Sequence, residues 1–259
     1  MYATLSPICS YFSTYKHNDY PNCSVGYGNW PNGSRPLVGL TSFPRSGNTW
    51  TRHLIETATG IHTGSLYNAN GLYNGGFTAE FDDPSLGRAV VYKAHGYADI
   101  FESGILLIRN PYDSFVSFYL FHTKGFMANP PLEEVFKDNK NWTNFVKRQH
   151  VRWPRIVENW FESGKRVLIV HYEDLVANTI YHLRRMLEFQ NITLTPDRLK
   201  CLNDDLEGRF HRQHSENFHF DPYNEELHHI IDADIQKVNS LLKSRNEPPV
   251  HKAAYDVEL

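Results

Sequence analysis

The chain has 259 residues, of which 41% are hydrophobic and 21% charged, and its formal net charge is −3. This length accommodates one α/β domain with a substantial core, and the alternation of strand and helix patterns favours one domain over two. The small negative charge excludes a general electrostatic attraction to nucleic acid or to anionic membranes, so any basic groups that bind a ligand must be local.

The sequence gives mixed signals about the cellular compartment. No apolar run approaches the roughly 20 residues that cross a bilayer, and the first residues lack the pattern of a signal peptide. We therefore expect a soluble chain, with any signal or anchor lost upstream. Three cysteines are too few for a disulfide framework, and their odd number leaves at least one without a partner in the chain. Four N-x-[ST] sequons favour the secretory lumen, with the cytoplasm as the alternative; they begin at Asn22, Asn32, Asn141 and Asn191.

Residues 1–35 are rich in turn-forming residues and show no sustained periodicity, so they predict an irregular N-terminal segment. The domain itself is expected to span residues 36–249, and residues 250–259 are expected to form a polar tail.

The stretch Leu37 to Gly60 predicts a strand, a tight loop and a helix. Leu37 to Ser42 is the buried strand, residues 43–49 form the loop, and the helix begins near Trp50. This arrangement directs backbone N–H groups and the positive end of a helix dipole at one anion.

The loop has the residue types of a phosphate or sulfate site. Arg45 supplies a positive charge, Ser46 and Thr49 supply hydroxyl groups, and Gly47 lets the backbone approach phosphate oxygens closely. A nucleotide-hydrolysing P-loop would have a glycine five residues before Gly47 and a lysine where Asn48 stands. A magnesium-dependent kinase or ATPase is therefore disfavoured.

Residues 61–86 are rich in Gly, Asn and Asp and have no periodicity, so they are either a covering loop on the acceptor side or a surface excursion. Ala89 to Lys93 is the next predicted strand, and Ala94 and His95 follow it. Two titratable groups, Lys93 and His95, are thereby expected at the carboxyl edge of the sheet, where open α/β sheets bind ligands.

Gly104 to Ile108 is a continuous apolar strand followed by Arg109. Pro111 fits the first turn of a helix, and Ser117 lies on that helix, eight residues after Arg109. An Arg at a strand end and a Ser one or two turns along a helix can converge on a single phosphate.

The remaining elements are mainly scaffold. Asn141 to Ser163 has helical spacing, with Pro154 as an interruption or a helix restart. Arg166 to Val170 is a strand that ends close to Tyr172. Helices are predicted at Thr179 to Phe189 and at Asn224 to Leu242. The C-terminal histidines have no zinc-binding spacing, so no metal site is expected.

Four of these motifs resemble those of sulfotransferases. Pro44 to Trp50 resembles the 5′-phosphosulfate loop, and Arg109 to Ser117 resembles the 3′-phosphate signature R-N-P-x-D-x-x-x-S. Lys93 to His95 is similar to the family's K-T-H, with Ala94 in place of Thr, and Tyr172 to Leu175 is similar to Y-E-D-L. The stretches LVGLTSFPRSGNTW and LLIRNPYDS are most similar to the WSC-domain-containing sulfotransferase-like proteins (WSCD family), here without a WSC domain.

The resemblance implies a three-layer, P-loop-like α/β fold with a central, mostly parallel sheet flanked by helices. It implies a PAPS-dependent enzyme of the Golgi that moves the sulfuryl group of 3′-phosphoadenosine 5′-phosphosulfate (PAPS) to a hydroxyl acceptor, which we expect to be a glycan, without a metal. His95 would be the general base, and Arg45 and Lys93 would assist catalysis. The residues expected to bind the nucleotide are Arg45, Ser46, Gly47, Asn48, Thr49, Trp50, Arg109, Ser117, Tyr172, Arg209 and Arg212.

The chain departs from the cytosolic sulfotransferases in its last third. The R-K-G and G-D-W-K-N segments of those enzymes are absent, and only Arg209 and Arg212 could take their place over the nucleotide. Two alternatives stay open: a catalytically silent domain that binds glycans or the nucleotide, and a P-loop kinase. No nucleic-acid partner is expected.

Overall fold

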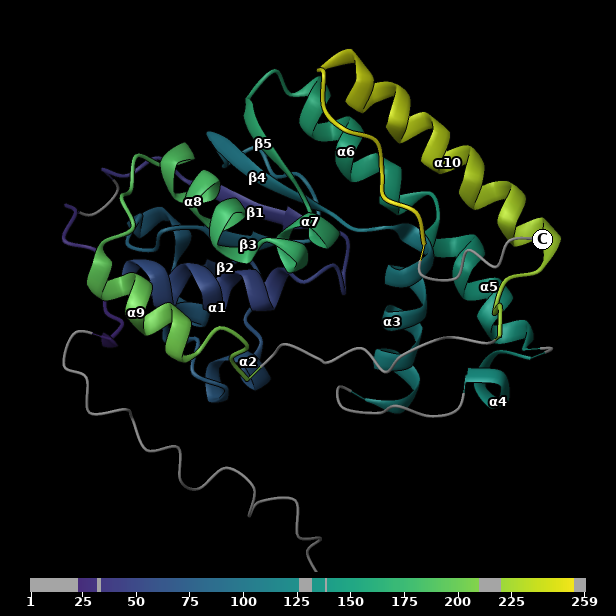
Figure 1. Cartoon of the computed structure of the whole chain (residues 1–259), viewed down its shortest axis with the longest axis horizontal. Coiled ribbons are helices and arrows are strands. Elements are labelled where there is room, and N and C mark those ends of the chain that lie inside the picture. Colours follow the sequence, from purple (N-terminus) through teal and green to yellow (C-terminus); the bar gives the residue numbers. More distant parts are fainter. Residues whose placement is uncertain (1–22, 32–33, 126–131, 138, 210–219, 254–259) are drawn as a thin grey trace, which may run out of the picture.

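The computed structural model describes residues 23–31, 34–125, 132–137, 139–209 and 220–253. Arg212, Asn22 and Asn32, which the sequence analysis named, lie outside these ranges, as does Cys9, one of the three cysteines. Figure 1 shows a central sheet with helices on both faces.

The sheet has five parallel strands in the order β2-β3-β1-β4-β5. They are β1 (Val38–Ser42), β2 (Gly64–Ser65), β3 (Tyr92–Ala94), β4 (Ser103–Ile108) and β5 (Arg166–His171). β1 and β4 are buried along their whole length, as expected of central strands covered on both faces. The predicted α/β class with a central parallel sheet is confirmed.

The strand order places β1 at the point where the chain changes direction across the sheet. After β1 the chain builds β2 and β3 on one side, and it then crosses to build β4 and β5 on the other. Loops that leave neighbouring strands at such a switch point diverge and open a crevice at the carboxyl edge. The loops after β1, β3, β4 and β5 all leave this edge, because every strand pair is parallel.

Two hydrophobic clusters, one on each face of the sheet, give the domain three layers. Side chains alternate along β4, so that Ile105 and Leu107 join one cluster while Leu106 and Ile108 join the other. The first cluster is covered by helices α1 (Asn48–Thr59), α7 (Tyr172–Ala177), α8 (Thr179–Phe189) and α9 (Pro196–Asp204). The second is covered by α3 (Pro111–Lys124), α4 (Leu132–Phe136), α5 (Lys140–Gln149), α6 (Arg152–Glu162) and α10 (Glu225–Ser244).

The strand that the sequence predicts from Ala89 is β3, which begins only at Tyr92. Val90 and Val91 already bond to His62 and Gly64 on the β2 side, whereas pairing with β1 starts at Tyr92.

Of the two alternatives for Pro154, the helix restart is confirmed, since α5 ends at Gln149 and Pro154 lies in the first turn of α6. A proline is tolerated there because the first N–H groups of a helix have no partner within the helix.

Residues 61–86 pack against the sheet and do not form a separate surface excursion. They contain β2, the short helix α2 (Asn70–Asn74) and the 3-10 helices η2 (Thr78–Phe81) and η3 (Pro84–Leu86). Phe77 and Ala79 are fully or almost fully buried. The segment is therefore part of the domain beside β3.

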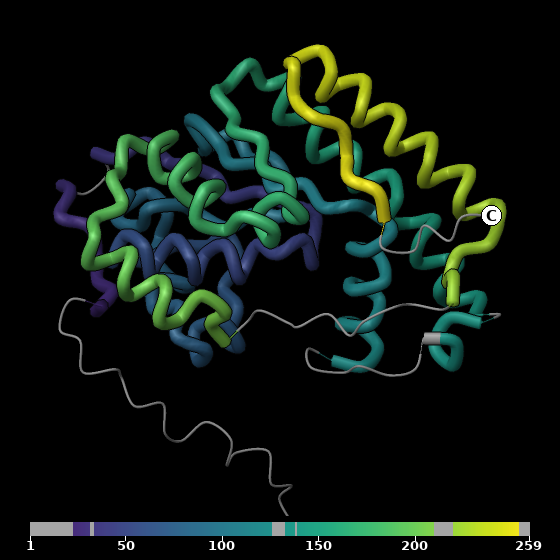
Figure 2. The backbone as a smooth tube through the Cα atoms, viewed as in Figure 1, coloured from purple at the N-terminus to yellow at the C-terminus, as the bar shows by residue number. Residues whose placement is uncertain are grey.

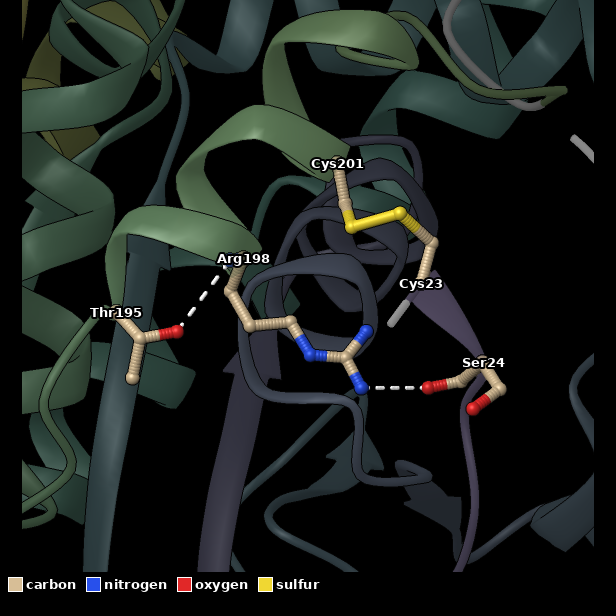
Figure 3. The surroundings of a disulfide bond; sticks show 5 residues. All are labelled: Cys23, Ser24, Thr195, Arg198 and Cys201. Carbon is tan, nitrogen blue, oxygen red and sulfur yellow. Dashed lines mark hydrogen bonds between the residues drawn. A yellow bond between two sulfur atoms is a disulfide. The ribbon is translucent and has the colours of Figure 1, made fainter. Parts of the chain in front are cut away.

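A disulfide between Cys23 and Cys201 joins the N-terminal segment to α9 (Figure 3). Beside it, Arg198 Nη2 donates to the Ser24 carbonyl at 2.6 Å. Gly26 bonds through its N–H to Gly60 and through its carbonyl to His62, at 2.9 Å each. These residues are thus fastened to both ends of the turn that follows α1.

The residues after α10 return to the sheet (Figure 2). Val250 is buried, and its N–H donates to Asn239 Oδ1 at 2.8 Å. The His251 carbonyl accepts from Asn110 Nδ2 at 2.6 Å, and His251 Nε2 lies 2.8 Å from Asp174 Oδ1. Residues 250–253 therefore close over the loops that leave β4 and β5.

Candidate functional site

The loop between β1 and α1 has the backbone of an anion site. Arg45 has a φ of 67° and Gly47 a φ of 85°, so two of three successive residues are in the left-handed region. The Ser46 N–H donates to the Phe43 carbonyl at 3.3 Å and closes the turn. Such alternation turns successive N–H groups toward one point, and a non-glycine residue in this conformation is typical of functional loops.

The start of α1 lacks the side chain that usually satisfies a helix N-terminus. Gly47 is the N-cap residue and has no side chain to accept from the first-turn N–H groups. The Ser46 side chain is fully buried, and its hydroxyl oxygen has no hydrogen-bond partner among the described residues. A buried hydroxyl without a partner beside an uncapped, positive helix end fits a bound phosphate or sulfate.

Asn48 and Thr49 lie on the first turn of α1 but differ in their surroundings. Asn48 is buried, and its Nδ2 donates to the Leu40 carbonyl at 2.9 Å and to Ser42 Oγ at 3.2 Å. Its side-chain amide therefore ties the helix start to β1. Thr49 is partly exposed at the same helix end.

Arg109 brings the end of β4 to this loop. Its Nη1 donates to the Arg45 carbonyl at 2.8 Å, and its guanidinium lies over the Tyr172 ring, 4.6 Å from the centroid. Arg45 Nε in turn donates to Ser117 Oγ on α3 at 3.3 Å. The structure thus places the two predicted anion-binding motifs side by side at one edge of the sheet.

Tyr172 lies between the two motifs and contacts both, through Gly47 and Arg109. It begins α7 directly after β5 and is 7% exposed. A Cβ atom added to Gly47 would lie 2.5 Å from the Tyr172 ring, so the loop can approach the ring only because residue 47 is glycine. The Trp50 and Tyr172 rings pack edge to face, with centroids 6.3 Å apart.

Trp50 also connects the site to the segment that was expected to cover the nucleotide. Its Nε1 donates to the Leu206 carbonyl at 3.0 Å, and His53 Nε2 lies 2.7 Å from the Asp205 carbonyl. These contacts hold residues 205–209 against α1. Arg209 is exposed at the end of this segment, whereas Arg212 lies outside the described residues.

His95 lies just beyond β3 and is held in one tautomer. Its Nδ1 is 3.1 Å from the Ser42 carbonyl, which can only accept, so Nδ1 carries the proton and Nε2 keeps a lone pair. Burial, together with the nearby Lys93 cation, lowers the His95 pKa to about 4 despite the opposing hydrogen bond to Ser42. His95 is therefore neutral at pH 7 and has a nitrogen that can accept a proton.

Lys93 is a second buried cation at this edge of the sheet, besides Arg109. It is 9% exposed, and among the described residues its ammonium has no hydrogen-bond or ion-pair partner. Burial is the main cause that lowers the Lys93 pKa to about 8; the Arg52 and Arg45 cations act in the same direction, and Glu80 opposes them. A buried ammonium without a fixed partner is poised to meet an anion.

A buried polar network beside Lys93 was not predicted from the sequence. Arg52 Nη1 and Glu80 Oε2 are 2.6 Å apart, and both side chains are 0% exposed. Arg52 also bonds Thr63, which donates through its N–H and hydroxyl to Glu56. Burial raises the Glu56 pKa to about 7. The network fastens segment 61–86 to α1, and no sequence spacing signals a contact between residues 52 and 80.

Comparisons with known proteins agree with these features. Residues 103–241 match the family model described as Sulfotransferase domain. The chain is 33% identical over 215 residues to a WSCD family member of Aedes aegypti and 32% identical over 219 residues to one of Drosophila melanogaster. These alignments cover 80% and 82% of this chain, and 67% and 68% of the relatives. The chain thus spans about two thirds of their length.

Solved structures share the fold. Mouse sulfotransferase SULT7A1, complexed with PAP, superposes with a TM-score of 0.52 and 15% identity, covering 81% of this chain and 86% of that one. A sulfotransferase from Alicyclobacillus acidocaldarius gives a TM-score of 0.51 and 13% identity, covering 81% of this chain and 96% of that one. At this identity the likeness shows the P-loop-like fold, as the sequence predicted.

Replacement of Gly47 by Ala should destabilise the domain in two ways. The left-handed backbone costs about 1–3 kcal/mol for a residue with a side chain, and the new methyl group would collide with Tyr172. Gly164→Ala is the matched control, since Gly164 has a φ of 66° and no atom within 4 Å of an added Cβ. Chemical unfolding should show a clearly larger loss for Gly47→Ala. Equal losses would contradict the packing of Tyr172 beneath the loop.

Proposed function

This chain belongs to the sulfotransferase family, among its WSCD members, and from that membership we propose that it transfers the sulfuryl group of PAPS to a hydroxyl acceptor. The observation that carries the proposal is the Arg109 to Arg45 hydrogen bond, which brings the two anion-binding motifs to one sheet edge. A nucleotide with a phosphate at each end of its ribose needs two such sites a short distance apart. A simple P-loop kinase needs only one, and Asn48 replaces its lysine.

Two groups of residues would bind the two ends of the donor nucleotide. Ser46, Thr49 and the N–H groups at the start of α1 would hold the 5′-phosphosulfate, with Arg45 beside them. Arg109 and Ser117 would hold the 3′-phosphate, which distinguishes PAPS from ATP. Tyr172, which lies between the two motifs, would contact the nucleotide there. The relevance of PAP to this site is supported by the mouse sulfotransferase that shares the fold and is complexed with it.

The reaction exchanges one sulfur–oxygen bond for another. The bond from sulfur to the bridging phosphate oxygen breaks, the bond to the acceptor oxygen forms, and the acceptor proton passes to His95 Nε2. Arg45 and the helix N-terminus would stabilise the charge that develops on the bridging oxygen. Lys93 would neutralise the sulfuryl oxygens during transfer. We propose a glycan hydroxyl as the acceptor.

The Golgi lumen is the proposed compartment. Support comes from the Cys23–Cys201 disulfide, since such bonds persist in oxidising compartments, and from the exposed sequon residues Asn141 and Asn191. Alkylation of the protein in intact cells, followed by mass spectrometry, should find Cys23 and Cys201 joined. Free thiols at both positions in protein from its native cells would contradict a lumenal location and favour the cytoplasm.

Two variants separate chemistry from nucleotide binding. His95→Ala should lower turnover of PAPS with a responsive glycan by about 10²- to 10⁴-fold, the usual contribution of a general base, and leave the affinity for PAP unchanged. Arg109→Ala should weaken PAP binding by about 10- to 100-fold, because a charge-assisted hydrogen bond contributes roughly 1.5–3 kcal/mol. Radiolabelled PAPS with a glycan panel and calorimetry with PAP provide the measurements. If His95→Ala turned over PAPS at the parental rate, His95 would not be the general base.

The alternative function has its own outcome. Tight PAP binding by the parental protein without turnover on any acceptor would indicate a silent nucleotide-binding domain.

The pH dependence of kcat/KM for PAPS reports the free enzyme. His95 is active when neutral, so activity should persist above its pKa of about 4, and no acid limb should appear between pH 5 and 7. Lys93 is active when protonated, so activity should be lost as pH rises through about 8. Lys93→Arg should move this alkaline limb upward, because guanidinium stays charged. An acid limb near 6.5, the ordinary value for histidine, would contradict the buried setting of His95.

A further inference from the structure

An exposed tyrosine lies directly against the candidate base. Tyr67 is 42% exposed, yet its ring stacks on the His95 ring with centroids 5.4 Å apart and planes inclined by 24°. Its hydroxyl oxygen accepts from the His95 backbone N–H at 2.8 Å. One side chain therefore holds His95 both by its ring and by its backbone.

The position of Tyr67 is fixed by the chain that carries it. The Tyr67 N–H donates to Ser65 Oγ at 2.9 Å, and Ser65 Oγ donates back to the Tyr67 carbonyl at 3.1 Å. Ser65 is almost fully buried in β2, and the next N–H, of Leu66, donates to the Lys93 carbonyl at 3.0 Å. Two strands of the sheet thus place this aromatic ring beside His95.

The exposed ring marks the side from which an acceptor reaches His95. A hydroxyl group must come within hydrogen-bonding distance of His95 Nε2 to lose its proton there. The molecule that carries this hydroxyl then lies next to Tyr67, a 42% exposed residue whose ring packs on His95. A flat aromatic surface beside a base suits a rigid ring with an apolar C–H face and outward hydroxyl groups, which is the shape of a pyranose.

We propose that Tyr67 forms one wall of the acceptor site, where it holds His95 through its hydroxyl group and stacks its ring on a pyranose of the acceptor. The proposal rests on the proposed function and deepens it, since it names a specificity residue and the chemical shape that it selects. It also assigns a role to segment 61–86, which carries Tyr67 and which the Arg52 to Glu80 ion pair fastens to α1.

Three variants test the two parts of this role. Tyr67→Ala removes both the ring and the hydroxyl group, whereas Tyr67→Phe keeps the ring and loses the bond to the His95 N–H. The matched control is Tyr181→Ala on α8, because Tyr181 is 55% exposed and also packs on a histidine, His182, with centroids 4.9 Å apart.

The first readout does not depend on turnover. Saturation-transfer NMR with methyl pyranosides, recorded with PAP present, should show transfer to the sugar ring protons for the parental protein, Tyr67→Phe and Tyr181→Ala. Tyr67→Ala should lose most of this transfer, while its dissociation constant for PAP stays within twofold of the parental value. Equal sugar transfer in Tyr67→Ala, or no transfer in the parental protein, would overturn the stacking role. This result stands whether or not PAPS is turned over.

The second readout uses steady-state kinetics with a glycan acceptor. Tyr67→Ala should raise the acceptor KM by about 3- to 10-fold, as expected for the loss of one stacked ring, and should lower kcat. Tyr67→Phe should lower kcat with the acceptor KM near the parental value, because only the hold on His95 is lost. An unchanged kcat in Tyr67→Phe would refute the positioning role. A rise in the KM for PAPS as large as that for the acceptor would show general damage to the site instead.

Discussion

The hydrogen bond from Arg109 to the Arg45 carbonyl is the contact on which the site depends. It joins the loop after β1 to the end of β4, and these two strands are neighbours at the point where the sheet changes direction. Arg109 also covers the Tyr172 ring, so three strand ends meet around one guanidinium. The Arg45 to Ser117 hydrogen bond adds a second link, from the same loop to α3. The two predicted motifs therefore lie side by side, and we propose that they bind the two ends of one nucleotide.

The same edge of the sheet carries the proposed donor side and the proposed acceptor side. On one side of β1, Arg109 and Tyr172 lie beside the loop that follows β1. On the other side, β3 carries Lys93, and His95 follows its last residue. The Ser42 carbonyl links the two, since it belongs to β1 and fixes the His95 tautomer. The parallel sheet therefore brings the positively charged residues of the proposed anion site close to the neutral imidazole of His95. Among the described residues, no group of side chains could hold a metal ion.

The sequence predicted features that are encoded locally. A buried strand followed by Arg45 and Gly47 dictates a turn at a helix start, and an Arg–Asn–Pro after an apolar strand dictates another, so both motifs and their common edge followed from the pattern. Contacts between distant residues could not be predicted in this way. The pairing of Cys23 with Cys201, the Arg52 to Glu80 ion pair and the stacking of Tyr67 on His95 each join segments whose separation carries no periodic signal.

The central claim is that the loop around Ser46 and the Arg109 to Ser117 motif bind one nucleotide together. Calorimetric titration of the parental protein with adenosine 3′,5′-bisphosphate, 3′-AMP and 5′-AMP tests it most directly. The account predicts one bisphosphate per chain, an affinity well above that of either monophosphate, and displacement of both monophosphates by the bisphosphate. A bisphosphate that binds no more tightly than the better monophosphate would contradict it.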